Sequence, residues 1–233
     1  FDQMRETLSA KTKTFLLCNP HNPVGRVLDR HELETIADLC LSNGTMICSD
    51  EIHADLVLDT DKQHIPIASL HPEVEKQSIT LISASKAFNL PAIGGLSLAI
   101  IPNPEIRLAF QNKAYGVATH PGALAYAATL AAYKDCDDWL LQTIRYLRGN
   151  RDYLEAEIAN MEGLSMTHAE ATFLAWIDVS NLGLMSPVST FLAHGVDLSD
   201  GTEMGRADHV RLNFACHRST LEEVVRRLKA SLP

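Results

Sequence analysis

Short apolar runs that end in polar or turn-forming residues recur through the first half of the chain. Runs of this length, bounded in this way, are typical of strands buried in a sheet. The four runs are residues 13–18, 45–48, 79–82 and 96–101. Because a helix or a long connection separates successive runs, the pattern predicts an α/β domain with a mostly parallel sheet.

Apolar residues at helical spacing separate the first two predicted strands. Asp29 is expected to cap this helix, and Glu32 three residues later completes a capping box. Asn43-Gly44 supplies the residues that end the helix. Further helical patterns cover residues 104–115, 121–133 and 137–161. The last of these is long enough to join two lobes.

The last third of the chain mixes strand and helix patterns. Strands are predicted at 171–179 and 210–214, and helices at 187–194 and 219–232. This mixture indicates a small α+β lobe. We therefore expect a first domain of residues 1–145, with the mostly parallel sheet, and a C-terminal domain of residues 146–233.

Composition and charge exclude several classes of protein. The chain has 233 residues, of which 46% are hydrophobic and 21% charged, as in ordinary globular proteins. Its net charge is -9 and it has no lysine or arginine cluster, so neither nucleic acid nor a membrane is an expected partner. The 5 cysteines are odd in number and widely spaced, which argues against a disulfide scaffold or a metal site and favours the cytoplasm.

Polar residues gather where the predicted strands end. In open α/β sheets the carboxyl ends of the strands are where ligands bind. The three segments are Asn19–Gly25, Asp50–His53 and Ser83–Lys86. Each alone has an ordinary structural explanation as a turn, a helix cap or a solvated lysine. Their occurrence together, in this order, favours a functional site.

These segments, with one more near the C-terminus, carry a resemblance to a known family. They read Asn19-Pro-His-Asn-Pro-Val-Gly25, Ser49-Asp-Glu-Ile-His53, Ser83-Ala-Ser-Lys-Ala-Phe-Asn89 and His209-Val-Arg-Leu-Asn-Phe214. Together they resemble the fold-type I, pyridoxal-phosphate-dependent aminotransferases. The second and third look most like the branch of cystathionine β-lyases, or carbon–sulfur lyases. The resemblance begins partway into the family's large domain, so we expect a fragment without about the first third.

The resemblance implies a fold, a cofactor and partners. The first domain is expected to be a partial, three-layer large domain that binds pyridoxal 5'-phosphate, and the substrate an amino acid. The family also implies a homodimer. Lys86 matches the family's Schiff-base lysine, which also acts as the base at the substrate Cα. Asp50 matches the carboxylate that keeps the pyridine nitrogen protonated.

Five further residues match binding positions of the family. Asn22 and His53 are expected to serve the phenolic oxygen of the cofactor. Ser83 and Ser85 match hydroxyl donors near its phosphate. Arg211 matches the arginine that binds the substrate α-carboxylate through two parallel hydrogen bonds.

One residue departs from the aminotransferase pattern and bears on the type of reaction. Gly94 lies eight residues after Lys86, where aminotransferases usually carry a phosphate-binding arginine. The lyase branch often lacks this arginine, which favours β-elimination from a sulfur amino acid over transamination. A third possibility is a regulatory effector module fused to a DNA-binding domain. The sequence upstream of Phe1 would separate the third possibility from the first two.

Overall fold

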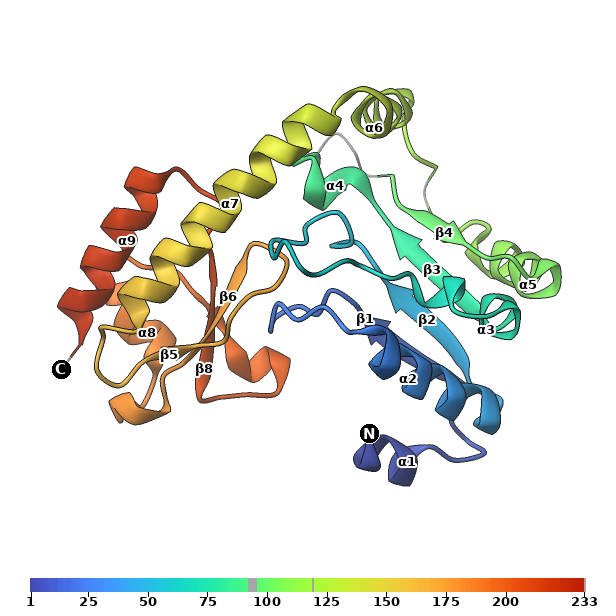
Figure 1. Cartoon of the computed structure of the whole chain (residues 1–233), viewed down its shortest axis with the longest axis horizontal. Helices are drawn as coiled ribbons and strands as arrows, with labels where there is room; N and C mark the ends of the chain where they lie inside the picture. The colour runs from blue at the N-terminus through green and yellow to red at the C-terminus, as the bar shows by residue number, and fades with distance from the viewer. Residues whose placement is uncertain (92–95, 119, 233) are drawn as a thin grey trace. The chain divides into compact units, whose positions relative to one another are not determined.

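The computed structural model describes residues 1–91, 96–118 and 120–232 (Figure 1). Gly94 lies outside the described residues. The chain divides into two compact units. The first consists of Phe1–Pro20, Val27–Asp55 and Gln63–Leu140, and the second of His21–Arg26, Leu56–Lys62 and Leu141–Pro233. The second unit therefore takes two short segments from the first half of the chain.

The first unit contains a four-stranded sheet in the order β1-β2-β3-β4. The strands are β1 (Thr14–Cys18), β2 (Met46–Asp50), β3 (Ser78–Ile82) and β4 (Leu98–Ile100). The first three are parallel, and β4 runs antiparallel to β3. The predicted α/β class with a mostly parallel sheet is confirmed. Because Cys18 pairs with Asp50 and Asp50 with Leu81, the carboxyl ends of three strands meet at one edge.

The first unit also contains six described helices. They are α1 (Asp2–Thr7), α2 (Arg30–Asn43), α3 (Pro72–Lys76), α4 (Ala84–Ala87), α5 (Pro104–Ala114) and α6 (Ala123–Asp135), with a 3-10 turn at Ile67–Ser69. On α2, the predicted capping box is present and Gly44 ends the helix at φ 68°. The apolar face of α2, with Leu33 and Ile36, packs against Leu17 and Ile47 of the sheet. Burial of this face fixes the helix on the strands.

The longest described helix, α7 (Asp137–Ile158), begins in the first unit and continues in the second. Asn150 on α7 is fully buried, and its amide nitrogen donates to the carbonyl oxygens of Phe214, at 3.0 Å, and Cys216, at 2.9 Å. These bonds join the helix to the end of the second unit's sheet. None of the described helices is long and apolar enough to cross a membrane.

The second unit has a small antiparallel sheet in the order β5-β6-β8-β7. Its strands are β5 (Ser165–Met166), β6 (Leu174–Asp178), β7 (Ser199–Asp200) and β8 (His209–Asn213). Its other helices are α8 (Pro187–Ala193) and α9 (Arg218–Ser231), with 3-10 turns at Ser180–Leu182 and Gly201–Met204. On α9, Leu221, Val225 and Leu228 are buried, as their helical spacing predicts. The α+β character expected of this part is confirmed.

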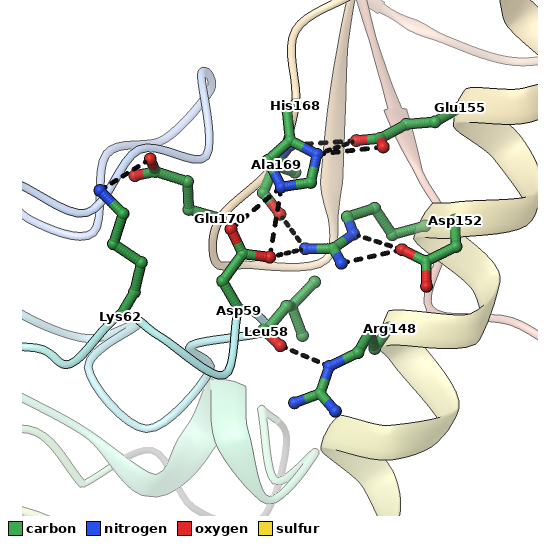
Figure 2. A network of polar contacts seen from close by, with 10 residues as sticks. Leu58, Asp59, Lys62, Arg148, Asp152, Glu155, His168, Ala169 and Glu170 are labelled. Atoms are coloured by element: carbon green, nitrogen blue, oxygen red, sulfur yellow. Dashed lines mark hydrogen bonds and ion pairs between the residues drawn. The ribbon is translucent and has the colours of Figure 1, made fainter.

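A polar network within the second unit holds Leu56–Lys62 against α7 (Figure 2). Arg151 is 5% exposed and donates to the Asp59 carboxylate and to the carbonyl oxygen of Ala169. His168 Nε2 lies 3.0 Å from a carboxylate oxygen of Asp59. The guanidinium thus has partners from two other segments, which fixes the path of Leu56–Lys62.

Candidate functional site

Asp50 and the segment Ser83–Lys86 lie at the same edge of the first unit's sheet. Asp50 is the last residue of β2, and Ser83 directly follows β3. The two strands are parallel neighbours, with Asp50 paired to Leu81. The structure therefore brings these sequence-predicted residues to the carboxyl ends of adjacent strands, where α/β proteins bind ligands.

Ser83 and Ser85 are ordered by the first turn of α4. Ser83 Oγ accepts a hydrogen bond from the Ser85 backbone N–H at 3.2 Å, so Ser83 caps the helix. Its hydroxyl also lies 3.0 Å from Ser85 Oγ and from the carbonyl oxygen of Leu96. Ser83 is buried and Ser85 half-buried, whereas Lys86 is exposed. The amine of Lys86 is therefore within reach of a small molecule.

Asp50 lines an open cleft of about 500 Å³, together with Leu81, Arg107 and Phe110. Its carboxylate accepts the Ile52 backbone N–H at 3.2 Å. Burial, and then the negative charge of Asp50, raise the pKa of the neighbouring Cys48 thiol. Asp50 thus places a carboxylate at the strand end, which is the group that pairing with a cationic ring nitrogen requires.

His53 is buried, at 3% exposure, in the turn that follows β2. The Ala54 N–H donates to the carbonyl oxygen of Glu51 at 2.9 Å and closes this turn. His53 thus belongs to the same unit as Asp50 and Lys86. Its contact with the cofactor's phenolic oxygen stays a prediction.

Asn22 and Arg211 lie together in the second unit. Arg211 Nη1 donates to Asn22 Oδ1 at 2.9 Å, and Nη2 donates to Ser199 Oγ at 3.2 Å. Ser199 is the β7 partner of Arg211 in the sheet register. These bonds use two of the five N–H groups of a guanidinium and set its orientation. The motifs predicted Asn22 and Arg211 as separate ligands, and Ser199 was missed because no motif contains it.

Sequence reasoning also missed a buried acid–histidine pair beside Asp50. Glu51 is 3% exposed, and one of its carboxylate oxygens lies 2.8 Å from His64 Nε2. Adjacent residues of a strand point to opposite faces of the sheet. The position of Glu51 directly after Asp50 therefore indicated that the two side chains face opposite sides. His64 lies in a connection without periodicity, and nothing in the sequence marks it.

The donor set at the sheet edge fits pyridoxal phosphate. Within the ranges that the structure describes, no group of three or more His, Cys, Asp or Glu side chains is arranged to hold a metal. One sheet edge instead carries a primary amine, a carboxylate and two hydroxyls, on Lys86, Asp50, Ser83 and Ser85. The amine matches the aldehyde of the cofactor, the carboxylate its protonated pyridine nitrogen, and the two hydroxyls its phosphate.

A family comparison agrees with this donor set. The model of "Aminotransferase class I and II" matches residues 1–228. The chain belongs to this family. The resemblance drawn from the four motifs is therefore confirmed at the level of the family.

Relatives of this aminotransferase-family chain include carbon–sulfur lyases. Cystathionine beta-lyase PatB of Bacillus subtilis is 36% identical over 100% of the chain and 62% of its own length. OvoB, whose crystal structure is known, is 44% identical in sequence to this chain. The two structures match with a TM-score of 0.97 over 100% of this chain and 61% of the OvoB chain. Cystalysin from Treponema denticola, whose crystal structure contains pyridoxal 5'-phosphate, is 29% identical, with a TM-score of 0.92, over 99% and 60%. The chain thus spans about three fifths of the length of these relatives.

Proposed function

We propose that the protein is a pyridoxal-phosphate-dependent carbon–sulfur β-lyase that acts on sulfur amino acids such as cystathionine. The observation that carries the proposal is the common sheet edge of Asp50 and Ser83–Lys86. Membership of the family supports the cofactor. The name of PatB, with Gly94 in place of the usual arginine, favours the lyase over the aminotransferase.

When bound, pyridoxal phosphate supplies an electron sink for the substrate Cα. Lys86 would hold the cofactor through its amine and would take the proton from Cα. Asp50 would hold a proton at the ring nitrogen, because a carboxylate there favours the cation. Ser83 and Ser85 would donate hydrogen bonds to the phosphate.

Arg211 would serve the substrate and Asn22 the cofactor. The guanidinium, fixed by Asn22 and Ser199, would bind the α-carboxylate through two parallel hydrogen bonds. Asn22, with His53, would serve the phenolic oxygen. Recognition of the α-carboxylate restricts the substrate to amino acids and leaves the choice of side chain open.

The reaction needs water and one amino acid. Lys86 removes the proton from Cα, the Cβ–S bond breaks, and the sulfur leaves with the bonding electrons as a thiolate that then takes a proton. Water hydrolyses the remaining three-carbon unit to pyruvate and ammonia. Cystathionine and water thus give homocysteine, pyruvate and ammonia, without a second organic substrate.

We also propose that the protein is a cytoplasmic homodimer. The domains 1–145 and 146–233 stay a prediction, beside compact units that divide between Leu140 and Leu141 and that assign His21–Arg26 and Leu56–Lys62 to the second unit. Exposed apolar side chains along α5 and α6 support a self-association surface. They include Leu108, Phe110, Leu124, Tyr126 and Leu130, at 44–77% exposure. Light scattering of the whole protein should give twice the mass of one chain, and the mass of a single chain would contradict the dimer.

Cofactor binding is tested first, on the whole protein. Added pyridoxal phosphate should produce a visible absorbance band, and borohydride reduction followed by peptide mapping should place the label on Lys86. Lys86→Ala should lose the band and the label while keeping the fold. Lys134→Ala, an exposed lysine of the same unit, is the matched control and should keep both. A label on another lysine would overturn the assignment of Lys86.

The reaction type is tested next. L-cystathionine alone should give pyruvate and a thiol. An amino acid with 2-oxoglutarate should give no glutamate. Glutamate without pyruvate or thiol would contradict the lyase and identify an aminotransferase.

A further inference from the structure

A chain of buried polar side chains runs beside the sheet edge in the first unit. Asn19 Nδ2 lies 3.5 Å from His64 Nδ1, and His64 Nε2 lies 2.8 Å from a carboxylate oxygen of Glu51. Ser49 Oγ donates to the other oxygen of Glu51 at 2.9 Å. Asn19, Ser49 and Glu51 are at most 3% exposed, and the His64 side chain is 9% exposed. The four side chains form a chain of polar contacts largely out of contact with water.

The neighbouring contacts fix the tautomer of His64. Asn19 Oδ1 accepts the Leu28 backbone N–H at 3.0 Å, so the amide nitrogen of Asn19 faces the ring. An amide nitrogen only donates, and Nδ1 must therefore accept. The ring hydrogen then sits on Nε2 and is donated to Glu51. The contacts thus assign the Nε2–H tautomer to His64.

Glu51 receives three donors in this arrangement. His64 Nε2 and Ser49 Oγ are joined by the Ile67 backbone N–H, which donates to Glu51 at 3.2 Å. The Glu51 carboxylate thus accepts hydrogen bonds on both of its oxygens.

The network is joined to the backbone at two residues, Glu51 and Asn19, that lie on either side of Asp50. Glu51 follows Asp50 in the chain, and its N–H donates to the carbonyl oxygen of Leu81 at 2.9 Å. Asn19, on the other side, donates its backbone N–H to the carbonyl oxygen of Asp50 at 3.0 Å. His64 therefore joins the two residues that frame Asp50, at the point where the sheet hydrogen bonds end.

We propose that His64 is a positioning residue, which through Asn19 and Glu51 fixes the strand ends around Asp50 and so directs the Asp50 carboxylate to the cofactor's ring nitrogen. This inference rests on the proposed function. If the network serves stability alone, substitution of His64 lowers the melting temperature and leaves cofactor affinity and spectrum unchanged. A positioning role moves the affinity and the spectrum at temperatures where the protein is fully folded.

The first test is a set of variants of the whole protein. His64→Ala should weaken pyridoxal phosphate binding by tenfold or more and shift the visible band, because Asp50 no longer holds the ring nitrogen in one state. His64→Gln keeps a donor for Glu51 and should recover part of the affinity. His71→Ala removes an exposed histidine of the same unit, paired with Glu73, and should match the parent.

Separate outcomes test the two proposals. Failure of the parent to bind pyridoxal phosphate overturns the proposed function and this inference with it. Binding by the parent that His64→Ala and His64→Gln both leave unchanged overturns the positioning role alone. If His64→Ala does not fold, the His64→Gln result and the following measurement decide.

Nitrogen-15 NMR of the His64 ring in the cofactor-free parent tests the network without any substitution. The protonated nitrogen should be Nε2, with Nδ1 showing the shift of an acceptor. A hydrogen on Nδ1, or a charged ring at neutral pH, would overturn the arrangement and the positioning role.

Discussion

Gly25 shows how a single residue shapes the loop that carries Asn22. Its φ is +78°, and an added Cβ would lie 2.9 Å from both Cα and Cβ of Ala169 in the same unit. Gly44, at the end of α2, also has a positive φ of 68°, but a Cβ there would meet nothing within 4 Å. Comparing substitutions at the two glycines therefore separates the cost of a left-handed backbone from the cost of steric overlap.

We expect Gly25→Ala to destabilise the protein more than Gly44→Ala. A left-handed backbone with a Cβ costs roughly 1–2 kcal/mol, which both variants incur. Overpacking against Ala169 adds roughly 1–3 kcal/mol at Gly25 alone. Urea unfolding of the two variants measures the difference in the free energy of unfolding, and equal losses would contradict the close contact with Ala169.

At the same scale, Asp50→Asn should slow turnover of the whole protein by two or more orders of magnitude. Removing one partner of a buried ion pair costs roughly 3–5 kcal/mol, and about 1.4 kcal/mol corresponds to a tenfold change in rate. Asp38→Asn, an exposed change on α2, is the control and should turn over like the parent. A loss below tenfold for Asp50→Asn would leave Asp50 as the acceptor of the Ile52 N–H and nothing more.

Among the elements, α2 shows how sequence-local bonds set a helix boundary. Asp29 Oδ1 accepts the Glu32 N–H at 2.9 Å, and Glu32 Oε2 accepts the Asp29 N–H at 3.0 Å. The two side chains thereby satisfy two backbone N–H groups that the first turn leaves without helical partners.

Asp29→Ala should therefore destabilise the protein by about 1 kcal/mol. Asp38→Ala, on the exposed face of the same helix, should change the free energy of unfolding by less than about 0.5 kcal/mol. Urea unfolding at equal protein concentration compares the two variants. Similar effects of both substitutions would argue that the capping box does not determine the start of α2.

For the molecule as a whole, the Asp59 network predicts how stability varies with pH. Burial raises the pKa of the Asp59 carboxyl, but hydrogen bonds from Arg151 and His168 outweigh it and hold the pKa below its ordinary value of 3.8. Burial lowers the pKa of His168, but hydrogen bonds to Glu155 and Asp59 outweigh it and raise the pKa above 6.5. The fold thus favours the charged form of both groups.

The two shifts give opposite limbs of a stability profile. The contribution of Asp59 is present above pH 3.8 and is lost as the pH falls through its lowered pKa. The contribution of His168 is present below pH 6.5 and is lost as the pH rises through its raised pKa. The His168 share is the smaller, because its side chain is 52% exposed and screened by solvent.

Urea unfolding across this pH range tests the profile. Asp59→Asn should flatten the acid limb, and His168→Gln should flatten the alkaline limb slightly. Parallel profiles for the parent and both variants would show that neither group contributes to the pH dependence.

The sequence by itself determined the longer strands and helices in their order along the chain, the caps of α2 and the residues of the four motifs; the two-residue strands β5 and β7 were not predicted. These features depend on contacts within a few residues, which periodicity and capping patterns report. The short helices α1, α3 and α4, of four to six residues, escaped because they span less than two turns.

Tertiary structure decided which distant residues meet. Asn22 and Arg211 are 189 residues apart, yet they share a hydrogen bond because β8 and Asn22 belong to one compact unit. The segments His21–Arg26 and Leu56–Lys62 join that unit from the first half of the chain. Glu51 meets His64 only after the connection beyond β2 folds back. No local pattern encodes such contacts, because they depend on the register of whole strands and the path of long connections.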